Sequence, residues 1–303
     1  MFYINKIRNF IKKHLNEKRE NTLNFRKIDD ISYLIRNNLK KIPDDIDLVV
    51  GIPRSGIIPA YIIALFINKN VCSLNEFTNN IVPTHGDRIV AENNNSKQKI
   101  LIVDDSICTG NAISKVKEQL SQMDKDKYEF IYLTIFATKE SQNKIDIFFE
   151  TVEQPRMFQW NYLNHCYANK CCYDMDGVLC VDPTPEENDD GEKYLDFIKN
   201  AKPLFIPNYT INSIVTSRLE KYRIPTENWL KQHNVKYKNL YMLNLPNQKE
   251  RLRLGCHAEF KAKIFKKLKN CSYFIESDAN QAKIIAKLSK KLVICVESDE
   301  LYK

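Results

Sequence analysis

Two apolar segments of the chain run into paired aspartates and then a glycine. Residues 100–110 begin with four aliphatic residues, continue with two adjacent aspartates and end in a glycine. Residues 171–177 pass from apolar residues through two aspartates, spaced two apart, to another glycine. Short apolar runs that stop at such turns are typical of buried parallel strands. Open α/β sheets bind ligands beyond the carboxyl ends of their strands, so each segment predicts a site.

Strand-like and helix-like segments alternate around both segments, which is typical of parallel α/β sheets. The first series comprises predicted strands at 47–51, 100–103 and 129–137 and predicted helices at 57–67 and 111–121. The second comprises predicted strands at 171–174, 211–216, 239–243, 272–276 and 292–296 and predicted helices at 226–233, 258–269 and 279–288. The sequence therefore predicts two doubly wound α/β domains, residues 1–165 and 166–303.

Composition narrows the setting in which the chain works. Nine cysteines occur without a Cys-x-x-Cys pair, which favours neither a disulfide framework nor structural zinc and indicates a reducing cytoplasm. No apolar run approaches the roughly 20 residues that span a bilayer. The formal charge of +8 suits anionic ligands, but no nucleic-acid-binding signature accompanies it, so we expect no nucleic acid partner. The basic amphipathic stretch at residues 2–15 predicts a helix packed on the first domain or, alternatively, peripheral contact with the inner membrane.

A strand followed by a small-residue turn and a helix offers free backbone N–H groups to a phosphate. The segment around Asp104 and Asp105 resembles the loop with which type I phosphoribosyltransferases bind 5-phosphoribosyl 1-pyrophosphate (PRPP). Residues 51–56 resemble the pyrophosphate loop of the same family and occur in the family's order. The resemblance implies that the aspartates accept hydrogen bonds from the ribose hydroxyls and that Arg88 closes over the pyrophosphate. The implied PRPP-binding residues are Arg54, Ser55, Gly56, Arg88, Asp104, Asp105, Ser106, Cys108, Thr109, Gly110 and Asn111.

The chain departs from this family in two places. Cys108 stands where threonine is common, and Ala112 stands where a hydroxyl residue is frequent. Side-chain contacts to phosphate would then be fewer. The segment that forms a base-recognising hood in nucleotide-making members is not evident.

The second segment resembles the nucleophile loop of haloacid dehalogenase (HAD) phosphatases. In that resemblance Asp174 is the nucleophile and Asp176 is the general acid and base. Further segments in the family's order imply that Thr216 binds the phosphoryl group and that Lys261, or alternatively Lys263, stabilises the intermediate. The implied Mg2+ ligands are Asp174, Asp176, Glu276 and Asp278. Only short elements are expected between these segments, so the second domain is predicted to be a HAD-like Rossmannoid sheet with a minimal cap.

A chain that combines these two domains resembles the dual-domain bacterial ribofuranosyltransferases of surface polysaccharide (O-antigen or capsule) synthesis. In such an enzyme the first domain transfers 5-phosphoribosyl from PRPP to a hydroxyl of a lipid-linked or oligosaccharide acceptor glycan. The second domain then removes the 5-phosphate. Asp105 is the candidate general base of the transfer, with Asp104 as the alternative.

Two other functions stay open at the level of sequence. One is a nucleobase or orotate phosphoribosyltransferase fused to a nucleotide phosphatase. The missing base hood argues against it. The other is a PRPP-sensing module attached to a phosphatase, which the altered turn at residues 108–112 keeps open.

Overall fold

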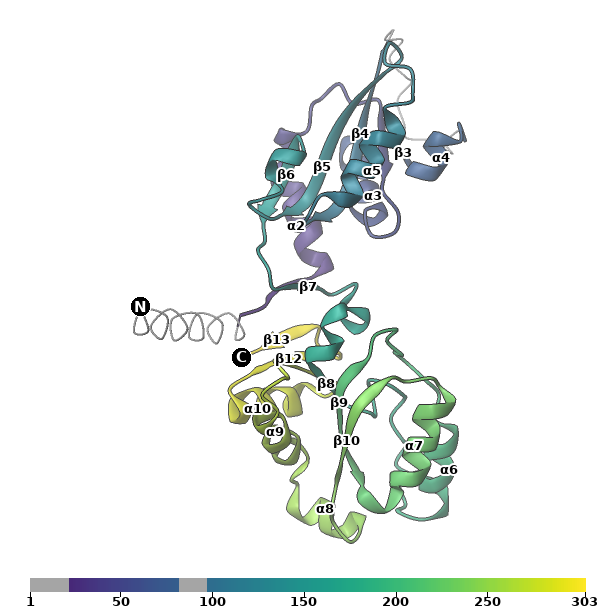
Figure 1. Ribbon diagram of the computed structural model, residues 1–303, viewed down its shortest axis with the longest axis vertical. Coiled ribbons are helices and arrows are strands. Elements are labelled where there is room, and N and C mark those ends of the chain that lie inside the picture. The colour runs from purple at the N-terminus through teal and green to yellow at the C-terminus, as the bar shows by residue number, and fades with distance from the viewer. Residues whose placement is uncertain (1–21, 82–96) are drawn as a thin grey trace, which may run out of the picture. The chain divides into compact units, whose positions relative to one another are not determined.

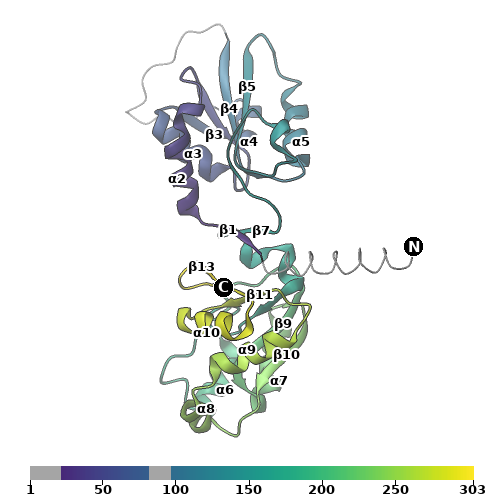
Figure 2. The ribbon, with the colours of Figure 1, turned by 90° about the vertical axis from the view of Figure 1, so that its left-hand side faces the viewer.

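The computed structural model describes residues 22–81 and 97–303, and they form two compact units (Figures 1 and 2). One unit comprises residues 26–156. The other comprises residues 157–303 together with residues 22–25. The chain crosses between the units twice, where strand β1 (Asn24–Arg26) pairs with strand β7 (Arg156–Phe158).

The division between the units falls at residues 156 and 157 rather than near residue 165. The reason is packing: Met157 and Leu23 are both buried in the core of the C-terminal unit. Phe25 packs there too, edge-on to Tyr162 with 5.8 Å between ring centroids. The predicted helix at residues 2–15 lies outside the described residues.

The unit of residues 26–156 is built on a five-stranded parallel sheet of order β3-β2-β4-β5-β6. Its strands are β2 (Leu48–Gly51), β3 (Asn70–Ser73), β4 (Gln98–Ile107), β5 (Tyr128–Ala137) and β6 (Ile147–Thr151). Its helices are α2 (Ile28–Asn38), α3 (Ile57–Ile67), α4 (Leu74–Thr78) and α5 (Asn111–Leu120). Helices α2 and α3 lie on one side of the sheet and α5 on the other (Figure 2).

Alternation along the strands explains these two layers. Ile100 and Ile102 of β4 pack in the same buried cluster as Ile113 and Val116 of α5. Successive residues of a strand face opposite sides of a sheet, so Leu101 faces the α2–α3 layer, and it is fully buried. The continuous apolar run of this strand is thus the pattern expected for a parallel strand covered on both faces.

The C-terminal unit holds a six-stranded sheet of order β10-β9-β8-β11-β12-β13. Its strands are β8 (Cys171–Tyr173), β9 (Ile211–Leu219), β10 (Tyr237–Leu243), β11 (Tyr273–Glu276), β12 (Leu292–Cys295) and β13 (Glu300–Tyr302). All neighbours are parallel except β13, which is antiparallel to β12. Its helices are α6 (Glu192–Asn200), α7 (Arg223–Gln232), α8 (Gln248–Leu254), α9 (His257–Lys267) and α10 (Ala279–Ser289).

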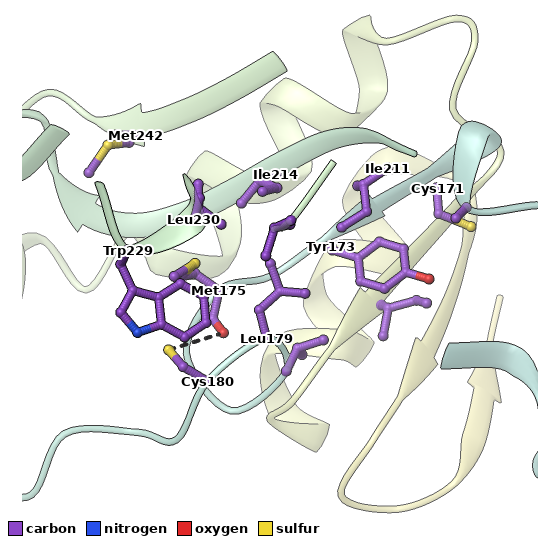
Figure 3. Close-up of a cluster of buried hydrophobic side chains, with 14 of the residues drawn as sticks. Cys171, Tyr173, Met175, Leu179, Cys180, Ile211, Ile214, Trp229, Leu230 and Met242 are labelled. Atoms are coloured by element: carbon purple, nitrogen blue, oxygen red, sulfur yellow. Dashed lines mark hydrogen bonds between the residues drawn. The ribbon is translucent and has the colours of Figure 1, made fainter. Parts of the chain in front are cut away.

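Two buried clusters fill the two faces of this sheet. Helices α9 and α10 cover one face, where Cys172 and Val215 point. Helices α6 and α7 cover the other, where Tyr173 packs in the cluster shown in Figure 3. Met175 and Trp229 lie together at one end of that cluster. Because Met175 is completely buried, it anchors the loop that carries the two aspartates on either side of it.

Between the strands of this unit the connections hold the short helices α6 and α8 and a 3-10 helix at Glu220–Tyr222, in addition to α7, α9 and α10. No helix within residues 22–81 or 97–303 combines the length and the apolar character needed to cross a membrane.

Candidate active sites

Each sheet reverses its strand order once, and both predicted sites lie at these points. In the first sheet β2 and β4 are neighbours, and the chain leaves them toward opposite edges. In the second sheet β8 lies between β9 and β11, and the later strands extend on either side. Loops after such strands diverge and leave a crevice in which α/β proteins bind ligands.

The loop after β2 packs directly against β4. The backbone N–H of Ile52 donates to the carbonyl of Val103 at 2.9 Å. A Cβ atom on Gly56 would lie 2.6 Å from the Ile52 oxygen and 2.7 Å from the Val103 oxygen, so only glycine fits. Glycine at position 56 therefore lets the loop and the start of α3 approach β4 closely. In the same loop, the peptide bond between Pro53 and Arg54 is cis.

Asp104 and Asp105 lie within β4 rather than after it, which corrects the predicted strand end at residue 103. The strand continues to Ile107 because β5 runs beside it, with Asp104 opposite Thr134. Asp105 is 6% exposed, and its Oδ1 accepts a 2.8 Å hydrogen bond from the Ser55 hydroxyl. This hydrogen bond joins the two loops that the resemblance assigned to PRPP.

Asp104 holds its proton at neutral pH. Burial, and then the neighbouring charge of Asp105, raise the pKa of Asp104 to about 8. The carboxyl group beside it, that of Asp105, accepts the hydrogen bond from the Ser55 hydroxyl.

Side chains from the segments after β5 and β6 donate hydrogen bonds to the turn from β4 to α5. The Thr138 hydroxyl donates to the Cys108 carbonyl at 3.3 Å, and the Gln154 amide donates to the Cys108 sulfur at 3.4 Å. Lys144 donates to the carbonyl of Thr109. Gly110, at φ +81°, takes the left-handed conformation that begins α5. The Cys108 side chain thus accepts a hydrogen bond from Gln154.

The remaining predicted PRPP-binding residues are less constrained. Arg54, Thr109 and Asn111 are exposed, and the Ser106 hydroxyl lies 3.5 Å from the Asp105 carboxylate. Arg88 lies outside the described residues.

In the second site one lysine bridges two buried carboxylates. Nζ of Lys261, on α9, donates to Asp174 Oδ2 at 2.6 Å and to the two Glu276 oxygens at 2.8 and 3.1 Å. Gln281 accepts a fourth hydrogen bond from this ammonium at 3.0 Å. Asp174 follows β8 and Glu276 ends β11, so adjacent parallel strands bring the acids together.

Electrostatics in this cluster are unbalanced. Burial, and then the charge of Glu276, raise the pKa of Asp174 well above its usual range, although Lys261 opposes the shift. Burial alone would lower the pKa of Lys261, but Asp174 and Glu276 raise it above its usual value. One ammonium thus faces two carboxyl groups, and their mutual repulsion favours a proton on Asp174 unless a further cation is bound.

Asp176 is held by a residue that the sequence analysis did not select. Nε of Arg218 lies 3.1 Å from both oxygens of Asp176, and Nη2 lies 2.5 Å from one of them. The Arg218 side chain has no exposed surface. Arg218 is two residues beyond Thr216 on β9, hence on the same side of the strand, and this spacing is the signal that could have identified it. The Thr216 hydroxyl oxygen accepts from the Arg218 backbone N–H at 3.1 Å.

The four predicted metal ligands are not assembled as a ready-made metal site. Asp174 and Glu276 bind Lys261, Asp176 binds Arg218, and Asp278 caps α10 by accepting from Gln281 N–H at 2.7 Å. Within residues 22–81 and 97–303, no group of three or more His, Cys, Asp or Glu side chains is placed to hold a metal ion.

The chemistry of the second site nevertheless fits a magnesium ion. Carboxylate oxygens are the ligands that Mg2+ prefers, and a cation beside Asp174 would favour the charged form of its carboxyl group. A cavity of about 480 Å³ opens beside the cluster. It is lined by Gly177, Asp182, Ser277, Asp278, Gln281, Val296 and Glu297.

Comparison with known proteins identifies the first unit. Residues 18–162 match the family described as "Phosphoribosyl transferase domain". No curated protein matches the chain.

Solved structures similar to the chain include purine phosphoribosyltransferase from Pyrococcus horikoshii Ot3, with 19% identity and a TM-score of 0.34 over 46% of this chain and 94% of that one. Another is the Helicobacter pylori xanthine-guanine-hypoxanthine phosphoribosyltransferase, with 19% identity and a TM-score of 0.35 over 46% of this chain and 95% of that one. A third is orotate phosphoribosyltransferase from Aeropyrum pernix, with 19% identity and a TM-score of 0.28 over 40% of this chain and 68% of that one.

Proposed function

Because residues 18–162 form a phosphoribosyltransferase domain, we propose that the chain is a two-step ribofuranosyltransferase of bacterial surface polysaccharide synthesis. The first domain transfers 5-phosphoribosyl from PRPP to a hydroxyl of a lipid-linked or oligosaccharide glycan. The HAD-like domain, assigned to residues 166–303, then hydrolyses the 5-phosphate. The reaction takes place in the cytoplasm, with peripheral contact at the inner membrane.

One observation carries this proposal. The chain that contains a phosphoribosyltransferase domain also places a buried aspartate, lysine and glutamate at the strand-order reversal of a second parallel sheet. A buried Asp174 with a strongly raised pKa, beside an acidic cavity, is the kind of perturbed group that marks reactive sites. In this proposal the second cluster removes the phosphate from the product of the first site.

In the transfer step, the acceptor oxygen forms a bond to C1 of the ribose while the bond from C1 to the pyrophosphate oxygen breaks. Asp104 and Asp105 hold the ribose hydroxyls, and backbone N–H groups after β2 and β4 hold the anionic groups. Asp105 receives the proton of the acceptor hydroxyl, because Asp104 keeps its own proton below about pH 8. Pyrophosphate is the leaving group.

In the hydrolytic step, the Asp174 carboxylate, in the charged form that a bound cation would favour, attacks the phosphorus and forms an aspartyl phosphate, while the bond from phosphorus to the ribosyl oxygen breaks. Asp176, protonated at this stage, donates its proton to the departing ribosyl oxygen. Asp176 then takes a proton from water, which hydrolyses the aspartyl phosphate to orthophosphate. Thr216 hydrogen-bonds the phosphoryl group, Lys261 neutralises its charge and Arg218 fixes the carboxylate of Asp176. Bound Mg2+, held by Asp174 and acids such as Asp278, would supply further charge neutralisation.

The test incubates the protein with PRPP and Mg2+ and either acceptor glycans or nucleobases, and follows pyrophosphate and orthophosphate. We expect pyrophosphate release only with a glycan, followed by orthophosphate. Release only with a nucleobase would favour the nucleotide-forming alternative, and release with neither would favour a PRPP-sensing module.

Variants separate the two steps. With Asp174→Asn we expect pyrophosphate release to continue and a phosphorylated ribosyl glycan to accumulate. With Asp105→Asn both products should be lost. Orthophosphate release by Asp174→Asn at the wild-type rate would refute the role of the second domain.

A further inference from the structure

Arg251 is a buried cation without an anionic partner. It lies on α8 and is 6% exposed. Its Nη1 donates to the Ser217 carbonyl and its Nη2 to the Asn188 side-chain oxygen, both at 3.2 Å. Its Nε has no hydrogen-bond partner. In the part of the chain that the structure describes, no carboxylate oxygen lies within 4.0 Å of this guanidinium.

Two other arginines show how unusual this is. Arg218 is buried as well, at 1% exposed, but the Asp176 carboxylate compensates its charge. Arg253, two residues beyond Arg251 on the same helix, is paired with Glu250 and keeps 66% of its side chain exposed. A buried charge without a partner costs stability, and it can be offset when an anion binds.

Arg251 lies at the edge of the proposed phosphatase site. Ser217, whose carbonyl it contacts, stands between Thr216 and Arg218 on β9. The Oγ of Ser217 is also buried and has no hydrogen-bond partner among the described residues. Burial, and then the charges of Arg251 and Lys261, lower the pKa of His257, which places Arg251 within electrostatic reach of the Lys261 cluster.

We propose that Arg251 and Ser217 form a recognition subsite for a second anionic group on the molecule whose phosphate is removed. The inference rests on the proposed phosphatase function and specifies its substrate class. That group is a carboxylate or a phosphate on the residue to which the phosphoribosyl unit is attached. The acceptor is therefore an acidic glycan rather than a neutral one.

The experiment compares three synthetic 5-phosphates with the full-length protein and Mg2+. Methyl ribofuranoside 5-phosphate has a neutral group at C1, carboxymethyl ribofuranoside 5-phosphate adds a carboxylate, and ribose 1,5-bisphosphate adds a phosphate. We expect kcat/KM to be higher for one of the two anionic compounds than for the methyl compound, and the better one identifies the group. Arg251→Met should lower this preference roughly 10- to 100-fold, as expected for loss of a charged hydrogen bond. Arg253→Met is the matched control and should keep the preference.

Thermal unfolding without ligand provides a second readout. Because Arg251 is an uncompensated buried charge, Arg251→Met should raise the melting temperature. A lower melting temperature together with an unchanged substrate preference would show that Arg251 is a structural residue and overturn the proposal. An equal loss of kcat/KM for all three compounds would also overturn it, because Arg251 would then serve the reacting phosphate itself.

Failure of the phosphatase function has a different signature. If the wild-type protein releases no orthophosphate from any of the three compounds, the phosphatase proposal falls. Calorimetric titration then decides the subsite. Weaker binding of the anionic compounds to Arg251→Met than to the wild-type protein and Arg253→Met, with unchanged binding of the methyl compound, supports it. Identical titrations of all three proteins with all three compounds overturn it.

Discussion

The Ser55 hydroxyl donates a 2.8 Å hydrogen bond to the buried carboxylate of Asp105, fifty residues further along the chain. This single contact ties the loop after β2 to the acidic residues of β4. It supplies a hydrogen-bond donor to a carboxyl group that is only 6% exposed to water.

Replacing Ser55 with alanine should therefore remove a hydrogen bond from a buried carboxyl group. We expect Ser55→Ala to reduce the free energy of unfolding by about 1–3 kcal/mol and to raise the KM for PRPP. Chemical denaturation and pyrophosphate release measure the two effects. Ser121→Ala, which removes an exposed hydroxyl after α5, is the control and should change neither. Equal behaviour of the two variants would show that the contact between the loops is not significant.

A methyl group at Gly56 should disrupt the same region more strongly. The added carbon of Gly56→Ala would meet two backbone oxygens at 2.6 and 2.7 Å, and backbone cannot move aside as a side chain can. We expect a loss of about 1–3 kcal/mol or more in unfolding free energy and loss of pyrophosphate release. In Gly191→Ala the nearest atom is a side-chain oxygen of Asp189 at 3.3 Å, so this control should unfold like the wild-type protein.

The proton on Asp104 makes stability depend on pH. With its pKa raised to about 8, folded Asp104 binds a proton that the unfolded chain releases near its ordinary pKa of 3.8. The folded state therefore loses stability as pH rises from about 4 toward 8. The uncharged amide of asparagine mimics the protonated acid, so the melting temperature of Asp104→Asn should match the wild type at pH 4 and exceed it at pH 8. A constant difference across this range would argue against a protonated Asp104.

Lys261 is the sole ammonium hydrogen-bonded to Asp174 and Glu276 among the described residues, and all three side chains are at most 6% exposed. Lys261→Met should cost about 3–5 kcal/mol, because it leaves two buried carboxylates without their cation. Lys263 is exposed on the same helix, and Lys263→Met should stay within about 0.5 kcal/mol of the wild type.

Adding Glu276→Gln to Lys261→Met tests the electrostatic explanation. Removing one of the two charges should recover part of the lost stability in chemical denaturation. No recovery would indicate that packing of the lysine stem, rather than its charge, maintains the cluster.

Apolar patterning predicted most of the central strands and covering helices. The predicted helix at residues 57–67 coincides with α3, and the strands at 211–216 and 292–296 begin where β9 and β12 begin. Elements at the edges were missed. Helix α2 buries only Ile31 and Ile35, and β13 has just three residues and pairs antiparallel at the sheet edge. Such short or thinly buried elements depend on neighbours that lie far away in the sequence.

Some residues of the candidate sites could likewise be predicted from the sequence, and others could not. Asp174 and Glu276 were selected from the sequence because carboxylates after apolar strands are locally conspicuous, and the structure brings them together through Lys261. Arg218 and Arg251 were not selected, because the local sequence does not show that their side chains are buried; the spacing from Thr216 is the one signal for Arg218. Only the three-dimensional structure shows that Arg218 contacts the carboxylate of Asp176 and that Arg251 contacts the carbonyl of Ser217.

The C-terminal unit is discontinuous in sequence, since Leu23 joins a core otherwise drawn from residues after 156. During synthesis residues 26–156 emerge completely before the ribosome has made the rest of the surrounding unit, and domains fold as they emerge. The inserted domain can therefore reach its native state first. The segment that contains Leu23 packs only later, because the core that it joins is made of residues after 156. A gene fragment beginning at residue 166 would lack that segment, so the C-terminal unit should be isolated by deleting the insert rather than by truncation.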